Sequence, residues 1–285
     1  YPTISKALEA ARPRDLIRIA PGVYKEALEI THTIRLEGSA DGKTIIELPV
    51  TADSLITIEA EAKGTLISGL TLKHKGFDHS PDRFSGITVM AQKVTIAACT
   101  IDHSAGHGIA VLEGGSATIT GCEISNCGWD GISVYGKGSQ VTTRDTKSHD
   151  NIQHGLAFWK NGSGNVENSN MSKNGLCGIL TMGAEVKATI SGTICSRNRE
   201  AGILLSDGVT ATLNANRCDK NLLSGIVARG KNTTVDMTNN ITTGNHEAGI
   251  LTHRGVKIGK FENNKSTGNT SRQIWRDANL KETAE

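Results

Sequence analysis

A Gly-Ile or Gly-Leu step that recurs about every 23 residues constrains this chain more than any other feature. Successive copies are 22 to 24 residues apart and begin at Gly86, Gly108, Gly131, Gly155, Gly178, Gly202, Gly225 and Gly249. A period this short cannot hold two helices and a turn, but it fits one coil of a solenoid. The repeat therefore predicts coils that stack along one axis.

Each repeat contains three pairs of apolar residues at alternate positions, which is the period of a β-strand. In one coil the pairs are Val94/Ile96, Cys99/Ile101 and Ile109/Val111. Stacked in register, such strands predict three parallel sheets around a narrow core. Small and β-branched residues fill a core of this kind, which agrees with an aromatic content of only 4%.

A column of asparagines lies four residues before the repeated glycine. Its members are Asn151, Asn174, Asn198, Asn221 and Asn245, and Asn269 precedes Gln273 by the same gap. Asparagine tolerates the left-handed backbone of a tight corner, and stacked side-chain amides hydrogen-bond to one another. We expect these residues to occupy such a corner and to form a structural column rather than a ligand groove.

The first 60 residues are less regular but still follow the same plan. Residues 4–11 have the pattern of a short amphipathic helix that covers the open end of the stack. Strands are expected at Leu16–Ile19, Ala27–Ile30, Thr33–Leu36, Thr44–Leu48 and Leu55–Ile58.

With this repeat, the sequence resembles the right-handed parallel β-helix proteins, the pectate-lyase-like superfamily with carbohydrate-binding and sugar-hydrolysis type repeats. The segment Thr3–Tyr24, TISKALEAARPRDLIRIAPGVY, is similar to the start of these proteins. The resemblance implies an all-β, single-stranded solenoid in one domain, residues 1–285, with a capping helix at 3–11, coils at 16–275 and a polar tail at 276–285. Lyases, hydrolases, epimerases, adhesins and interaction domains share this fold, and their catalytic motifs are not matched here.

Charge and hydropathy exclude two classes of partner. The net charge is +2, from 31 Lys and Arg against 29 Asp and Glu, so a nucleic-acid binder is not expected. No apolar stretch approaches the ~18 residues of a membrane span. The compartment stays open, and a carbohydrate-active chain would be secreted or periplasmic.

The six cysteines contain no C-x-x-C pair, so neither a zinc site nor a redox motif is indicated. Cys99 and Cys122 share one inward row, and Cys195 and Cys218 share another. We interpret them as reduced thiols that fill the core. No cofactor or metal motif is present, and nothing in the sequence indicates a bound Ca²⁺.

An insertion interrupts the repeat at residues 73–85, KHKGFDHSPDRFS. Its position next to a Gly-Ile strand predicts that it overhangs that face, and charged loops over a rigid sheet are frequent sites. The candidate residues in this loop are Asp78, His79, Asp82 and Arg83.

The next coils carry a second departure from the repeat, a gathering of His, Asp and aromatic residues. The candidate catalytic residues are His107, Asp130, Tyr135, His154 and Arg83. The candidate substrate-binding residues are Asp78, His79, Asp82, His103, Trp129, Lys137, His149, Asp150, Trp159 and Lys160.

These residue types suit the chemistry of an acidic polysaccharide. A base must take the C5 proton of a uronate ring, which His154 or His107 offers, and Tyr135 offers an acid. Arg83 or Lys137 would neutralise the sugar carboxylate, and both tryptophans would stack on sugar rings. Hydrolysis would instead need paired carboxylates, such as Asp102 with Asp130 or Asp150.

A third departure favours a different function. The later coils carry apolar residues on the same outward face, at Leu180, Met182, Leu204, Val227 and Leu251. Large apolar groups in line on a surface often mark an interface. Two hypotheses therefore stand: a protein that binds, and perhaps cleaves or epimerises, an acidic polysaccharide or oligosaccharide on the Gly-Ile face, or a non-catalytic scaffold for a protein partner or a second copy. Enzymatic activity is left open, with lyase, epimerase and hydrolase as the classes considered.

Overall fold

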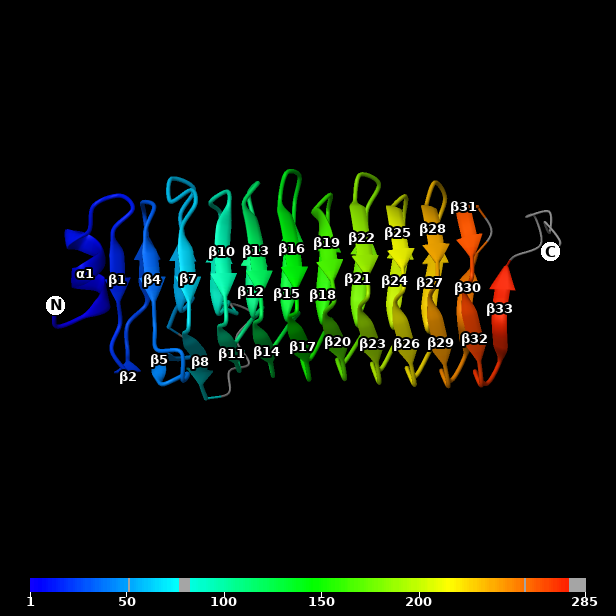
Figure 1. Cartoon of the computed structure of the whole chain (residues 1–285), viewed down its shortest axis with the longest axis horizontal. Coiled ribbons are helices and arrows are strands. Elements are labelled where there is room, and N and C mark those ends of the chain that lie inside the picture. The colour runs from blue at the N-terminus through cyan, green and yellow to red at the C-terminus, as the bar shows by residue number, and fades with distance from the viewer. Residues whose placement is uncertain (51, 77–82, 254, 277–285) are drawn as a thin grey trace.

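The computed structural model describes residues 1–50, 52–76, 83–253 and 255–276 as a right-handed parallel β-solenoid (Figure 1). In these residues three parallel sheets of eleven strands run along the axis, and the chain visits each sheet once per coil. The predicted fold class is confirmed.

Sheet A contains β1 (Leu16–Arg18), β4 (Arg35–Glu37), β7 (Leu66–Ser68), β10 (Val94–Ala97), β13 (Ser116–Thr120), β16 (Gln140–Arg144), β19 (Ser163–Glu167), β22 (Lys187–Ser191), β25 (Thr210–Asn214), β28 (Thr234–Thr238) and β31 (Lys257–Glu262). Sheet B contains β2 (Gly22–Tyr24), β5 (Thr44–Pro49), β8 (Thr71–Lys75), β11 (Thr100–Asp102), β14 (Glu123–Ser125), β17 (Lys147–His149), β20 (Asn170–Ser172), β23 (Ile194–Ser196), β26 (Arg217–Asp219), β29 (Ile241–Thr243) and β32 (Lys265–Thr267). Sheet C contains β3 (Leu28–Ile30), β6 (Ile56–Ile58), β9 (Ile87–Val89), β12 (Ile109–Val111), β15 (Ile132–Tyr135), β18 (Leu156–Trp159), β21 (Ile179–Met182), β24 (Ile203–Ser206), β27 (Ile226–Arg229), β30 (Ala248–Thr252) and β33 (Arg272–Arg276).

The strands stack in register, so each inward row continues from coil to coil. Ile109 pairs with Ile87 on one side and with Ile132 on the other. All three side chains are fully buried, as are both members of the predicted pair Val94/Ile96. The alternating pattern in the sequence therefore identified the core-facing residues correctly.

Helix α1 (Ile4–Ala10) closes the N-terminal end of the stack, as predicted for residues 3–11 (Figure 1). The hydroxyl of Thr3 accepts a hydrogen bond from the backbone N–H of Lys6, 3.1 Å away, which caps the first turn. The Glu26 carboxylate accepts the N–H groups of Ile4 and Ser5, each at 2.9 Å. The predicted tail lies almost wholly outside the described residues.

The asparagine column forms a continuous buried ladder at the corner between sheets B and C. The side-chain N–H of Asn174 donates to Asn198 Oδ1 at 3.1 Å, and the same oxygen accepts the backbone N–H of Asn174 at 2.9 Å. Asn198 in turn donates to Asn221 Oδ1 at 3.0 Å and to the backbone carbonyl of Met171. The amide of Gln273 ends the ladder by accepting two N–H groups of Asn269.

The expected backbone conformation of these asparagines was wrong by one residue. The left-handed position is the residue before each asparagine, such as Asp150 with φ 55° and Lys173 with φ 59°. The reversal of the chain occurs at that residue, which leaves the asparagine side chain free to point inward and join the ladder.

The ladder also explains the repeated glycine. A Cβ atom on Gly155 would lie 2.7 Å from the carbonyl oxygen of Gly178 and 2.8 Å from Nδ2 of Asn174. Only glycine leaves room for the amide column at this close approach.

The six cysteines are buried thiols without a disulfide bond. Cys195 and Cys218 face each other in register on β23 and β26. They occupy the small-residue rows of the core that the sequence predicted.

We predict that Asn198→Ala lowers the free energy of unfolding by roughly 2–5 kcal/mol, because it leaves the amide of Asn174 and the carbonyl of Met171 buried without partners. Chemical denaturation followed by circular dichroism measures the change. The matched control is Asn165→Ala, whose side chain is exposed on sheet A, and we expect it to change stability by less than about 0.5 kcal/mol. Equal effects of the two substitutions would contradict a structural role for the ladder.

Candidate functional site

The outer face of sheet C brings together the residues that immediately precede successive glycines. The backbone N–H of Gly108 donates to the carbonyl of Asp130 at 3.0 Å, and that of Gly131 donates to the carbonyl of His154 at 2.9 Å. These bonds place His107, Asp130 and His154 on three adjacent coils in one row. Together with Trp129 and Trp159 we call them the central cluster.

Asp130 is the hub of the central cluster. Its side chain is fully buried, and its carboxylate accepts the indole N–H of Trp159 at 3.1 Å and the backbone N–H of His154 at 3.1 Å. Burial raises the pKa of Asp130 to about 6, although the hydrogen bonds from Trp159 and His154 oppose the rise. The carboxyl group therefore titrates close to neutral pH.

His107 lies against Asp130 from the preceding coil. Its Nδ1 is 3.4 Å from Asp130 Oδ2, and its ring centroid is 5.0 Å from that of Trp129. Burial lowers the pKa of His107 to about 4, so the imidazole is neutral at pH 7. A proton on Nδ1, facing the carboxylate, would leave the Nε2 lone pair free to accept a proton.

His154 is held in the opposite sense. Its Nδ1 accepts the backbone N–H of Cys177 at 3.1 Å, so the proton of the neutral ring is on Nε2. Burial lowers the pKa of His154 to about 4 as well. Between the two imidazoles proposed from the sequence, this geometry makes His107 the candidate base and His154 a hydrogen-bond donor.

A more exposed group borders the central cluster at the ends of β15 and β18. Tyr135 pairs with Trp159 across the two strands, and the Lys160 ammonium lies 5.1 Å from the centroid of the Tyr135 ring. Lys137 is exposed in the turn that follows β15. Trp159 links this cationic and phenolic group to the buried Asp130.

The insertion meets the corner between sheets B and C. The described residue Arg83 lies beside Gly128, and it lines a small surface pocket with His103, Asn126 and Ile152. The Nε2 atom of His103 is 3.0 Å from the carbonyl oxygen of Gly76. Asp78, His79 and Asp82 lie outside the described residues, and so does the part of the loop that was expected to overhang the face.

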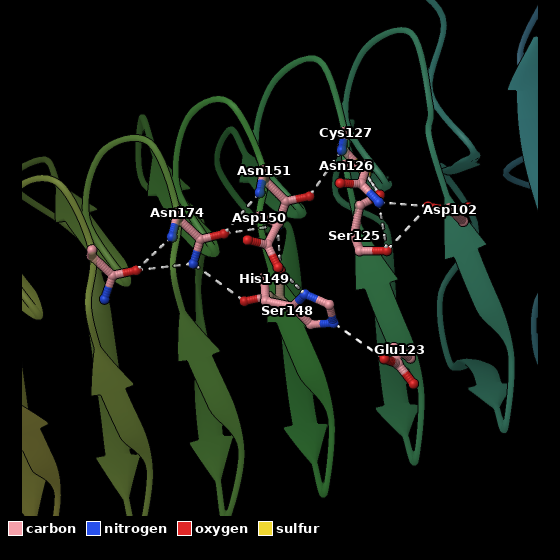
Figure 2. Close-up of polar contacts among 11 residues, drawn as sticks. Asp102, Glu123, Ser125, Asn126, Cys127, Ser148, His149, Asp150, Asn151 and Asn174 are labelled. Atoms are coloured by element: carbon pink, nitrogen blue, oxygen red, sulfur yellow. Dashed lines mark hydrogen bonds and ion pairs between the residues drawn. The ribbon is translucent and has the colours of Figure 1, made fainter.

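His149 and Asp150 belong to a separate polar group on the sheet B side of the same corner, as Figure 2 shows. The imidazole of His149 lies between Asp150 Oδ2, at 2.7 Å, and Glu123 Oε1, at 3.2 Å. Asp102 accepts a hydrogen bond from the side chain of Asn126 at 2.8 Å. Neither Asp102 nor Asp150 contacts Asp130, so the carboxylate pairs considered for hydrolysis are not formed in the described residues.

The apolar row continues the outer face of sheet C beyond the central cluster. Leu180, Leu204 and Val227 are each 8% exposed or less, because they pack on one another and on Trp159, Met182 and Leu251. These side chains already cover one another within the chain. A protein partner at this row stays a prediction.

Comparison with known proteins places the chain by its repeat. A model described as "Right handed beta helix region" matches residues 85–233 and 153–280. The chain belongs to this right-handed β-helix family. No curated protein matches it.

Solved structures share the fold at low sequence identity. The mannuronan C-5 epimerase AlgE4 A-module of Azotobacter vinelandii is 13% identical with a TM-score of 0.69, over 99% of this chain and 94% of that one. The AlgE6 A-module of the same organism is 14% identical with a TM-score of 0.63, over 95% and 92%. The GH87 α-1,3-glucanase catalytic unit of Streptomyces thermodiastaticus is 15% identical with a TM-score of 0.58, over 97% and 67%.

Metal and membrane features were searched in the same coordinates. Across residues 1–50, 52–76, 83–253 and 255–276, no three or more His, Cys, Asp or Glu side chains are grouped in a way that would hold a metal ion. No helix of the described chain has the length and hydropathy of a membrane span.

The sequence did not indicate how Trp159 is used. We predicted a tryptophan that stacks on sugar, whereas its indole N–H is engaged by Asp130 on the preceding coil. The signal was the spacing of 29 residues, one coil plus the length of a strand, which brings the two positions onto neighbouring rungs.

We predict that folding stability falls as the pH drops from about 6.5 to about 4, and that His154→Gln reduces this fall. His154 has a folded pKa below its unfolded value, so the unfolded chain binds the proton first and acid favours unfolding. Asp130 contributes the opposite slope, since its raised pKa favours the folded state in acid, but two imidazoles outweigh one carboxyl group.

Urea denaturation at several pH values tests this expectation. His246→Gln is the control, because that side chain is exposed at the corner. The interpretation fails if the His154→Gln and wild-type stability profiles are parallel over this pH range.

Proposed function

We propose that this chain binds an acidic polysaccharide along the outer face of sheet C and removes a proton from it with His107. The observation that supports this most is the buried contact of His107 with Asp130, which would hold the imidazole with Nε2 available. A neutral imidazole oriented by a carboxylate is a common general base. Structures of similar fold include enzymes named for mannuronan and α-1,3-glucan, which supports a polysaccharide as the ligand.

The reaction would start at C5 of a uronate ring. His107 Nε2 takes the C5 proton, and the electron pair left on carbon moves into the ring carboxyl group. A nearby cation must balance the added charge, and Lys137, Lys160 and Arg83 are the candidates from the described residues.

Two outcomes follow from the same intermediate. If the C4–O bond breaks and a proton reaches the leaving oxygen, the polymer is cleaved with an unsaturated end. If a proton returns to C5 from the opposite side, the ring is epimerised. Tyr135 is exposed next to Lys160 and is the candidate donor in either case.

The long, open face suits a polymer better than a small molecule. Trp129 is half-buried beside His107, and its ring offers an apolar plane to the C–H groups of a sugar. The apolar row beyond Trp159 provides further weakly polar surface along the axis for neighbouring sugar rings.

We predict that wild-type protein acts on at least one of alginate, polygalacturonate and glycosaminoglycans, and that His107→Gln lowers kcat by about 10²- to 10⁴-fold. Ultraviolet absorbance detects unsaturated ends, and NMR detects deuterium taken up from solvent at C5. His253→Gln, an exposed residue after β30, is the control and should keep full activity. Full activity of His107→Gln, or no reaction with any acidic polymer, would remove the support for this function.

The same assay gives a pH profile. We expect kcat/KM to fall as the pH drops from about 6 to about 4, because protonation of Asp130 removes the partner of His107 and protonation of His107 removes the base. A profile that is flat through this range would contradict the assigned roles.

A further inference from the structure

Three cationic side chains occupy one row at the corner between sheets B and C, and they are not part of the central cluster. Lys173, Arg197 and Lys220 follow β20, β23 and β26 on consecutive coils. The backbone N–H of Lys173 donates to Ser196, and that of Arg197 donates to Asp219, which places the three directly above one another. We call this row the cation ladder.

The cation ladder is exposed and without counter-ions. All three side chains are exposed, and none makes an ion pair or a side-chain hydrogen bond within the described residues. The nearest carboxylates are engaged elsewhere: Asp219 pairs with Arg217, and Glu200 accepts the thiol of Cys177. Arg199, on the same coil as Arg197, is also exposed and adds to the positive charge.

The backbone gives no reason for lysine or arginine at these positions. All three residues are in the left-handed region, with φ between 55° and 59°, which costs a residue other than glycine or asparagine about 1 kcal/mol. The same row holds Asn126 on one side and Gly244 on the other, so the less strained residue types fit this corner. The long cationic side chains are therefore retained at a cost to local stability.

Charge bounds the ladder at one end. On the preceding coil the row holds Asp150, which is paired with His149, and Glu123 and Asp102 lie close by, as Figure 2 shows. After Lys220 the row continues with Gly244. A ligand of the ladder thus meets three rungs of positive charge, with repulsion for an anion toward the N-terminal coils.

We propose that the cation ladder binds a linear acidic polysaccharide that runs parallel to the solenoid axis, with one carboxylate per coil. Coils stack about 4.8 Å apart, which is close to the length of one sugar ring in an extended chain that carries a carboxylate on every ring. The identity of the polymer rests on the proposed function. The ladder then holds the chain next to the central cluster.

Nucleic acid fits this row less well. Duplex DNA carries a charge about every 1.7 Å along its axis, which would place several phosphates at each coil. Single strands bind through aromatic platforms, but the residues that follow the ladder asparagines include the aliphatic Ile152 and Leu222. The balanced charge of the whole chain, +2, agrees with a local rather than a general anion site.

The test is equilibrium binding of fluorescent oligogalacturonates of two to six rings at low salt. The ladder variant is Lys173→Asn/Arg197→Asn/Lys220→Asn, which suits the left-handed backbone and should fold at least as stably as the wild type. The control variant, Lys187→Asn/Lys231→Asn/Lys257→Asn, removes the same charge from exposed positions outside the ladder.

We expect the ladder variant to bind about tenfold more weakly and the control to stay within about twofold of the wild type. Affinity for the wild type should rise up to three rings and then level off, and the fully methyl-esterified oligomers should not bind.

Several results would overturn the proposal. They are wild-type affinity in the ladder variant, equal binding of the esterified oligomers, no binding by the wild type, or a ladder-dependent loss of single-stranded DNA binding in place of oligogalacturonate binding. Turnover is measured separately, so ladder-dependent binding without turnover would count against the proposed catalysis and leave the ladder intact.

Discussion

The buried asparagine ladder is the interaction on which the rest of this structure depends. Each side-chain oxygen, such as that of Asn198, accepts both the backbone and the side-chain N–H of the coil before it. This double acceptance fixes the distance and the register of adjacent coils at once. The glycine that follows must lack a side chain because the amides occupy the space, and the residue before that glycine then points outward. The row of His107, Asp130 and His154 is a consequence of this packing.

The site uses the same geometry for a different end. Stacking brings a carboxylate and two imidazoles into neighbouring coils, and burial holds all three close to their neutral forms. An isolated carboxylate in this position would be costly, but Asp130 receives the N–H groups of Trp159 and His154. The outer face therefore combines a desolvated proton-transfer group with an exposed cationic border, within a scaffold that moves little.

The fold could be predicted from the sequence because its periods are local and repeated. Ile109 and its equivalents recur at one position of every coil, so the core rows and the sheets could be assigned without knowing any distance. Two details depended on torsion angles that no period reveals: the left-handed residue proved to be Asp150 and not Asn151, and the Trp159 indole turns back toward Asp130. The separation of Asp102 from Asp130 was equally hidden, because a one-residue step at the corner sends side chains to different faces.

The closing contact of Gln273 with Asn269 has a further consequence for how such a chain changes over time. Every internal amide meets the same two neighbours, so duplication of a whole coil would extend the column without creating any new kind of bond, while the terminal glutamine would still seal it. Loss of a single residue would instead turn every later side chain out of phase. Genetic variation in this architecture is thus tolerated in units of one complete turn, and the outer faces lengthen or shorten in steps of the same size.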